Sequence, residues 1–271
     1  MRFAICNELF EGWSFADVCE HVAAVGYAGL ELAPFTLAPS AHELTNAQCR
    51  TLRATAAAAG LEIVGLHWLL AKTEGLHLTS PEVGVRDRTA AYLRDLARAC
   101  HELGGSVMIF GSPGQRSLLP GVSVDQAFDH AVEVFSAITP DLDRLGVRLC
   151  LEPLGPVETD FINTCAEAAR VVDAVAHPNV QLHLDVKAMC SEAEPVVDLV
   201  RRWAPRAGHF HANDPNLQGP GFGDLDFAPI LSALRESGYA HWVSVEVFDF
   251  APGAEVTARE SLACLQRASV P

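Results

Sequence analysis

Short apolar runs alternate with longer segments of helical periodicity along the whole chain, and the alternation repeats about eight times. The short runs are rich in β-branched residues and leucine, whereas the longer segments repeat their apolar residues at three- and four-residue spacing. Strands that alternate with helices in this way indicate βαβ units and a parallel sheet. The predicted strands are residues 3–6, 29–32, 62–66, 106–110, 148–152, 180–185, 208–212 and 242–247.

Capping residues and glycines mark the helices between these strands. Ser14 opens the first helix, with Asp17 three residues on, and Gly26 closes it. The predicted helices are residues 14–26, 45–60, 85–103, 123–145, 165–176, 194–203, 227–237 and 254–268. Pro140 lies inside the fourth helix and should kink or divide it, because proline cannot donate the backbone hydrogen bond.

Eight strands and eight helices predict a single (β/α)8 TIM barrel that forms one domain over residues 1–271. Its active site would lie at the C-terminal ends of the strands. A doubly wound open sheet is the second choice, but it would carry a glycine-rich phosphate-binding turn after the first strand. The chain has Asn7-Glu8-Leu9-Phe10-Glu11 there, so the barrel is favoured.

Charge and composition limit the classes of partner that the chain could bind. The chain has 19 basic and 34 acidic side chains, a net charge of -15, which repels nucleic acid and anionic membrane surfaces. It contains no uninterrupted apolar stretch of about 18 residues and no signal peptide at its start, so we expect a cytoplasmic protein. Its 8 cysteines include no C-x-x-C pair, which favours buried thiols over disulfides or a zinc site.

Four consecutive strands end in a carboxylate or an imidazole: Glu152, Asp185, His211 and Glu246. Successive members are about 30 residues apart, the length of one βα unit, so a barrel would bring all four to one mouth. A single acid after a strand could be a helix cap, but three crowded carboxylates repel one another unless a cation compensates. Oxygen donors with one imidazole favour Mn²⁺, Mg²⁺ or Co²⁺, with Zn²⁺ also allowed.

The segments LEPLGPVETDFINT, LHLDVKAM, HFHANDP, GFGDLDF and WVSVEVF resemble the sugar phosphate isomerase/epimerase family, the xylose-isomerase-like barrels that include ketose 3-epimerases of the D-tagatose 3-epimerase type. The resemblance implies one divalent metal ion, Mn²⁺ first, bound by the four residues above. It implies that Glu152 and Glu246 are also the catalytic acid/base pair. The implied reaction transfers a proton at the carbon next to the carbonyl of a small ketose, through a cis-enediolate, and the implied assembly is a homodimer or homotetramer.

Substrate contacts are predicted at Asn7, His67, Glu158 and Lys187. Glu158 matches a family position that binds substrate, although it also fits a surface acid. His67 fits either a substrate contact or a buried, hydrogen-bonded histidine, and Lys187 fits either the inward face or solvent.

Three further features are assigned roles outside the proposed chemistry. His183 and His209, two residues before a predicted ligand, should pack in the barrel interior. Gly219–Gly223 is typical of a flexible lid, because no Lys or Arg lies nearby to hold a phosphate.

Two departures from the resemblance leave the substrate open. Ala188 stands where the epimerases carry a histidine, and Asn216-Leu217-Gln218 stands where they carry an arginine. A lyase or deglycosidase acting on 3-oxo-sugar conjugates is therefore a second hypothesis, and a non-catalytic sugar-binding barrel a third. An apurinic endonuclease of the same superfamily is disfavoured, because Ala188 and Asp226 replace zinc ligands and the net charge repels phosphate.

Overall fold

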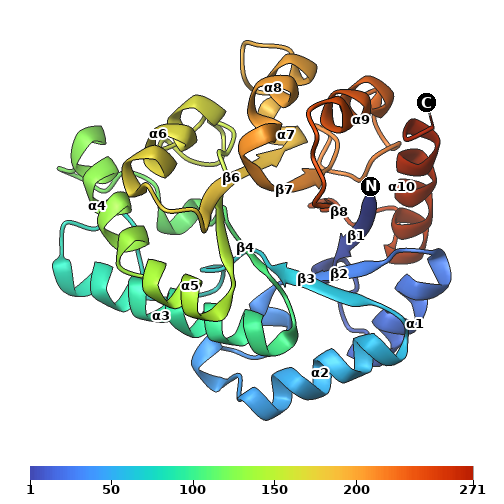
Figure 1. Cartoon of the computed structure of the whole chain (residues 1–271), viewed down its shortest axis with the longest axis horizontal. Coiled ribbons are helices and arrows are strands. Elements are labelled where there is room, and N and C mark those ends of the chain that lie inside the picture. The colour runs from blue at the N-terminus through green and yellow to red at the C-terminus, as the bar shows by residue number, and fades with distance from the viewer. Residues whose placement is uncertain (271) are drawn as a thin grey trace.

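Each predicted apolar run forms a strand, with small shifts at the ends. The structure is a computed structural model that describes residues 1–270; Pro271, the last residue of the predicted domain, lies outside them. The strands form one closed barrel in chain order: β1 (Arg2–Cys6), β2 (Gly29–Leu32), β3 (Glu62–Leu66), β4 (Val107–Phe110), β5 (Arg148–Leu151), β6 (Val180–Asp185), β7 (Ala207–Ala212) and β8 (Trp242–Val245). All neighbours are parallel, and β1 pairs with β8 to close the ring (Figure 1). The predicted (β/α)8 fold is confirmed.

The helices match the predicted segments to within two residues at their ends, except that the fourth is divided in two. They are α1 (Phe15–Val25), α2 (Asn46–Ala58), α3 (Val83–Leu103), α4 (Val124–Ser136), α5 (Thr139–Leu145), α6 (Cys165–Val175), α7 (Val186–Met189), α8 (Val196–Trp203), α9 (Phe227–Glu236) and α10 (Ala254–Ala268). Ser14 caps α1 through the Asp17 amide, and Gly26 ends it in the left-handed region at φ 109°.

The predicted fourth helix is divided at Pro140, as its sequence indicates. α4 ends at Ser136 and α5 begins at Thr139, so Pro140 lies in the first turn of α5, where its missing N–H costs no helical hydrogen bond. α7 was not predicted: it is a single turn directly after β6, and the Asp185 carboxylate caps it through the Ala188 amide.

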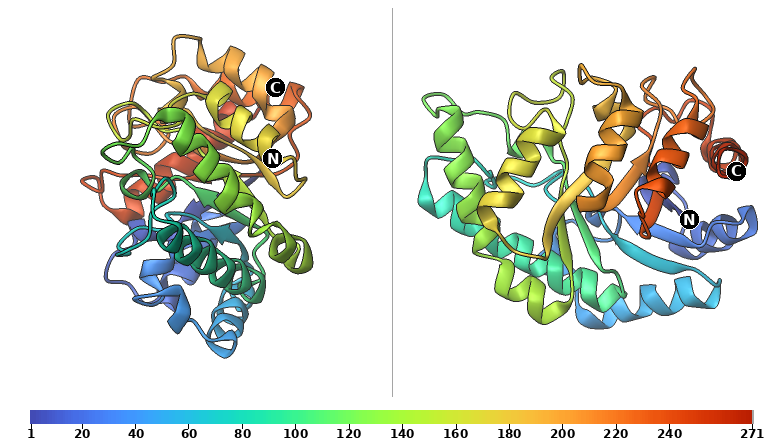
Figure 2. Two further views of the ribbon diagram at one scale, coloured as in Figure 1. Left: turned by 90° about the vertical axis from the view of Figure 1, so that its left-hand side faces the viewer. Right: turned by 45° about the horizontal axis from the view of Figure 1, so that its top comes forward.

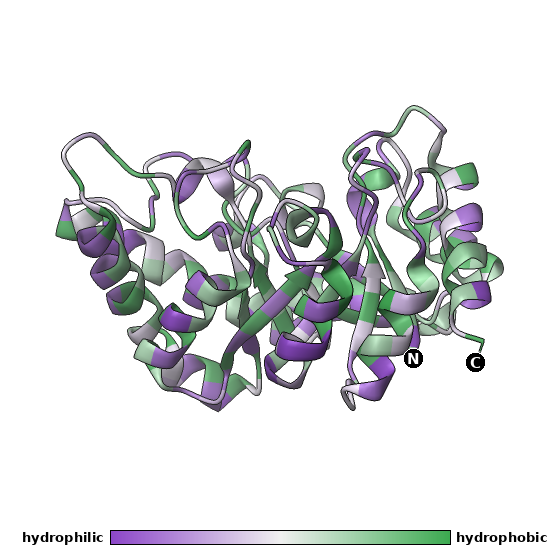
Figure 3. Cartoon of the chain, turned by 90° about the horizontal axis from the view of Figure 1, so that it is seen from above, coloured by the Kyte–Doolittle hydropathy of each residue, from purple (hydrophilic) through white to green (hydrophobic). Residues whose placement is uncertain are grey.

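Long connections follow the strands, and short ones lead from each helix into the next strand. The long loops gather along one edge of the molecule, above helices that carry both hydrophilic and hydrophobic residues (Figure 3). Two further views show the helices outside and the strands within (Figure 2). The C-terminal ends of the strands, which carry the predicted site residues, therefore open among these loops.

One part of the barrel interior is an apolar cluster. Ala4, Val64, Val107, Ile109 and Cys150 form a buried cluster of their own, apart from the larger core between strands and helices. Closure between β3 and β4 requires glycine, because a Cβ at Gly65 would lie 2.0 Å from the carbonyl oxygen of Val107.

Two negative findings concern the described residues. None of their helices combines the length and apolarity that a membrane crossing requires. All eight cysteines have free thiols, and six of these are buried, which agrees with the prediction from their spacing.

Candidate metal centre and active site

The barrel brings the four predicted ligands together at one mouth. Glu152, Asp185 and His211 each offer a ligand atom, and with His183 these atoms lie within 4.8 Å of one another. Asp185 and His211 are register partners on β6 and β7, so their side chains point the same way. Glu246 joins them from β8, with Oε2 3.1 Å from His211 Nδ1.

The donor atoms fit a divalent cation. His211 Nδ1 and Glu246 Oε2 lie 3.1 Å apart in the buried interior, and neither meets the geometry of a hydrogen bond to any group of residues 1–270. Buried polar atoms normally have partners, so two such atoms side by side indicate a missing common partner. A cation would supply it and would offset the repulsion among the carboxylates.

Glu31 supports His211 from behind and was not predicted. It is fully buried on β2; its Oε1 accepts a hydrogen bond from His211 Nε2 at 3.0 Å and its Oε2 accepts one from His209 Nε2 at 2.7 Å. Donation through Nε2 leaves Nδ1 of His211 as the lone-pair nitrogen that faces Glu246. A carboxylate between two leucines of a buried strand was the available sequence signal.

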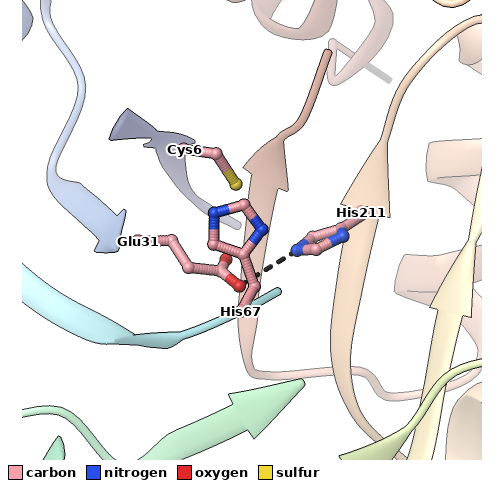
Figure 4. Close-up of side chains that lie close together, drawn as sticks. All are labelled: Cys6, Glu31, His67 and His211. Carbon is pink, nitrogen blue, oxygen red and sulfur yellow. Dashed lines mark hydrogen bonds and ion pairs between the residues drawn. The ribbon is translucent and has the colours of Figure 1, made fainter. Parts of the chain in front are cut away.

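Figure 4 shows Cys6, Glu31 and His67 gathered on one side of His211. These four residues also place one potential ligand atom each within 4.8 Å of one another. Both ring nitrogens of His67 already have carboxylate partners, and His211 Nε2 is bonded to Glu31. The cluster therefore supports the mouth of the barrel rather than forming a second centre.

His67 lies between two carboxylates. Its Nδ1 donates to Glu246 Oε1 at 3.1 Å and its Nε2 donates to Glu8 Oε2 at 2.9 Å. The neighbouring Trp68 Nε1 donates to the same oxygen of Glu246 at 2.9 Å. Glu246 thus has one oxygen held by two donors and the other free.

Two residues that were not predicted position Glu152, one through its backbone and one beside its side chain. Arg116 is fully buried and donates to the backbone oxygens of Glu152 at 2.5 Å and Ile162 at 2.7 Å, which joins the start and end of the loop after β5. Burial lowers the pKa of Arg116 to about 10. Gly111 makes room for the side chain, since a Cβ there would lie 2.2 Å from Glu152 Oε2.

Asp185 is oriented by two donors. Its Oδ1 accepts from the Ala188 amide at 2.7 Å and its Oδ2 accepts from Asn213 Nδ2 at 2.6 Å. Ala188 therefore contributes its backbone to the site, although its methyl group cannot replace an imidazole.

Of the predicted substrate contacts, Glu158 and Lys187 form a pair. Lys187 Nζ donates to Glu158 Oε1 at 2.7 Å and lies 4.2 Å from the ring centroid of Phe248. The lysine side chain is mostly buried, so it faces the barrel mouth rather than solvent. The side-chain amide of Asn7 is already hydrogen-bonded to the connection after β2. Its Nδ2 donates to Thr36, and its Oδ1 accepts from the Ala33 amide.

His183 and His209 lie in the interior, one layer below. Their rings stack at 5.5 Å, and His183 meets His211 edge-on at 4.2 Å. Neither nitrogen of His183 has a hydrogen-bond partner, and burial together with the neighbouring histidines lowers its pKa well below the usual value. This neutral ring packs in the core, as predicted, yet it also reaches the ligand group.

The two candidate acid/base carboxylates have opposite pKa shifts. Burial, with the charges of Glu246 and Asp185, raises the pKa of Glu152 well above its usual value. Burial acts the same way on Glu246, but His211 and His67 outweigh it and lower its pKa well below the usual value. For His211, burial is outweighed by Glu246 and Glu31, which raise its pKa. The shifts favour the protonated form of Glu152 and the ionised form of Glu246, the pattern that acid/base chemistry needs.

Glu152, Glu158 and Glu246 line one cavity of about 360 Å³, with Trp68 and Phe248 among its walls. This volume is ordinary for a small-molecule site, and a few polar groups converge on one end of it.

Residues 19–268 match the model of the xylose isomerase-like TIM barrel family. The chain belongs to this family. The resemblance stated from the site segments is thereby confirmed.

Sequence relatives and solved structures agree with this family and fold. The chain is 29% identical to a D-psicose 3-epimerase of Agrobacterium fabrum over 87% of this chain and 81% of that protein. It is 26% identical to a putative hydroxypyruvate isomerase of Mus musculus over 86% of each chain. A crystal structure of a D-psicose 3-epimerase superposes with a TM-score of 0.86, covering 99% of both chains at 24% identity, which shows the same fold.

Proposed function

We propose that this protein is a metal-dependent sugar epimerase or isomerase that transfers a proton at the carbon next to the carbonyl of a small ketose. The observation that carries the proposal is the pair Glu152 and Glu246, which line one cavity beside the convergent donor set and have pKa values shifted in opposite directions. The relatives are named as epimerases and isomerases, which supports the same reaction class.

The ion would be held by Glu152, Asp185, His211 and Glu246, with Mn²⁺ the first choice and Mg²⁺, Co²⁺ or Zn²⁺ the alternatives. When bound, a divalent cation polarises the carbonyl and hydroxyl oxygens of a chelating sugar and so acidifies the C–H between them.

The protein's own groups move the proton. Glu246 is ionised and its Oε2 has no hydrogen-bond donor, so that oxygen can accept the substrate proton. Trp68 and His67 keep Oε1 in place, which makes His67 a positioning residue in this proposal. The raised pKa of Glu152 favours its protonated form, which would deliver a proton to the opposite face and so invert the carbon.

The Glu158–Lys187 pair borders this cavity and would bind substrate hydroxyls, with the carboxylate accepting and the ammonium donating. Asn7 lies farther away, on a larger cavity next to the first. We also retain the prediction of a cytoplasmic location. The predicted assembly is a homodimer or homotetramer, which size-exclusion chromatography with light scattering can test.

A lyase or deglycosidase acting on 3-oxo-sugar conjugates is the second candidate. The larger adjoining cavity of about 620 Å³ favours it, because a free ketose would leave that space empty.

Solvent-deuterium exchange tests the proposal. The purified protein is chelated, Mn²⁺ is added back, and a panel of ketoses is incubated in ²H₂O and read by NMR. We expect label at the carbon next to the carbonyl, together with the epimer or isomer. Glu246→Gln should abolish exchange, whereas Glu62→Gln, an exposed acid at the start of β3, should not change it. If no ketose is labelled and a 3-oxo-glycoside is cleaved, the second candidate is correct.

A further inference from the structure

Two cavities meet at Trp68. The smaller one contains the proton-transfer carboxylates, and the larger one, of about 620 Å³, lies among the loops after β1, β2 and β3. Trp68 lines both. The ring of Phe248 stacks on Trp68 at 5.9 Å beside the smaller cavity, and Phe35 lies 5.8 Å from it beside the larger one.

Trp68 is held in this place at a conformational cost. Its φ of 51° lies in the left-handed region, which bulky residues rarely adopt. Its indole N–H donates to Glu246 Oε1 at 2.9 Å. Trp68, which lines both cavities, is therefore attached directly to a carboxylate of the proposed reaction.

The larger cavity combines aromatic faces with an unsatisfied acceptor. Phe10, Trp13 and Phe35 line it, and Trp13 is 37% exposed, unusual for so large an apolar side chain. Glu8 lines it as well and is only 6% exposed. Its Oε2 accepts from His67, but Oε1 has no hydrogen-bond partner among residues 1–270.

We propose that the substrate carries a second, neutral ring with hydroxyl groups, and that this ring occupies the larger cavity. The inference rests on the proposed function and extends its substrate: the ketose that reacts beside Glu152 and Glu246 is one ring of a larger conjugate, and a free ketose would fill the smaller cavity alone. Aromatic faces pack against the flat apolar side of a sugar or phenol ring, and Glu8 Oε1 accepts from a ring hydroxyl. A hydrocarbon ring would leave this oxygen unpaired. An anionic group would meet two carboxylates, Glu8 and Glu11, against the single ammonium of Lys72 in the same lining.

Equilibrium binding tests the inference without requiring turnover. Isothermal titration calorimetry on the Mn²⁺-loaded protein compares four probes: methyl, cyclohexyl and 4-hydroxyphenyl β-D-glucopyranoside, and cellobiose. We expect cellobiose or the 4-hydroxyphenyl glucoside to bind at least about tenfold more tightly than the methyl glucoside, because the added ring is buried on aromatic faces. The tighter of the two identifies the second ring as a sugar or a phenol. The cyclohexyl glucoside should gain less, since it has no donor for Glu8.

A pair of variants locates the ring. Trp13→Ala should reduce the ratio of dissociation constants between one-ring and two-ring probes to near one. Trp203→Ala, a matched truncation at the end of α8 and outside both cavities, should preserve the ratio, and thermal melting checks that both variants fold.

The inference is overturned if no ring-bearing probe binds more tightly than the methyl glucoside. It is also overturned if the cyclohexyl glucoside binds as tightly as the hydroxyl-bearing probes, or if Trp13→Ala keeps the full gain. A binding gain without deuterium exchange on any sugar would instead contradict the proposed function and leave the second-ring site in place.

Discussion

The side chains that orient the candidate centre act through hydrogen bonds to its donor atoms. Glu31 determines which nitrogen of His211 faces the centre, and His67 with Trp68 does the same for the oxygens of Glu246. Such partners of metal ligands fix the orientation and basicity of the groups they contact. We therefore expect metal affinity to depend on Glu31 even though it offers no free oxygen to the ion.

Glu31→Gln should weaken Mn²⁺ binding by about 10–100-fold, the usual effect of removing a partner behind a metal ligand. The amide can still accept a hydrogen bond from one histidine, but it loses the charge that both histidines contact. Calorimetric titration of the chelated protein gives the affinity. Glu62→Gln is the matched control, because Glu62 pairs only with Arg2 at the surface. Equal affinities of the two variants would contradict the role assigned to Glu31.

Metal affinity should also rise with pH. The pKa values of His211 and Asp185 are raised above their usual values, so protons compete with a cation for both groups. Below these pKa values protons compete with the ion, and above them the competition disappears. We expect apparent affinity to increase by about tenfold per pH unit for each proton displaced. Titration in two buffers of different ionisation enthalpy should show net proton release; affinity independent of pH would contradict the assigned charge states.

Single elements place these residues through local irregularities. The register of the sheet shifts between Leu30 and Glu31 and between Leu182 and His183, next to residues that face the barrel interior at the site. The one-turn helix α7 exists because Asp185 caps it, so the same carboxylate both starts a helix and faces the candidate centre. In β3, by contrast, Gly65 is needed because it has no side chain, which allows β3 to approach β4 closely.

Gly65→Ala should destabilise the barrel by about 1–3 kcal/mol, the usual cost of overpacking, because its Cβ would meet the backbone of Val107 at 2.0 Å. Gly114→Ala is the control, since a Cβ there meets no atom within 4 Å and should change stability by less than about 0.5 kcal/mol. Urea unfolding followed by circular dichroism measures both. Equal midpoints would show that β3 and β4 can separate at no cost.

At the scale of the whole molecule, closure of the barrel is what gathers the site. The candidate ligands come from the C-terminal ends of β5 to β8. Their supporting residues come from β2, from the loops after β1, β3, β4 and β7, and from α7, so no half of the chain contains the ligands with all their partners. An ion bound at this junction would contact the native state only, and binding to the native state alone raises stability by mass action.

Removal of the metal should therefore lower the melting temperature. At a free Mn²⁺ concentration of about 100 times Kd the ion adds about 2.7 kcal/mol, which for a chain of this size corresponds to about 5–10 °C. Scanning calorimetry with and without chelator measures the shift. Asp185→Asn should show a much smaller shift, which separates a specific site from general attraction of cations to a chain of charge -15. An identical shift in this variant would place the ion elsewhere.

The sequence alone determined the eight strands, their main helices and the convergence of the four strand-end candidate ligands, because apolar periodicity, capping residues and chain spacing are local properties. Even the break at Pro140 followed from one residue. Tertiary structure alone decided the contacts between distant strands: Glu31 behind His211, Arg116 beside Glu152, and Trp68 between two cavities. The partner of a buried charged residue cannot be read from a periodic sequence pattern. The partner lies on a distant strand and comes near only when the barrel closes.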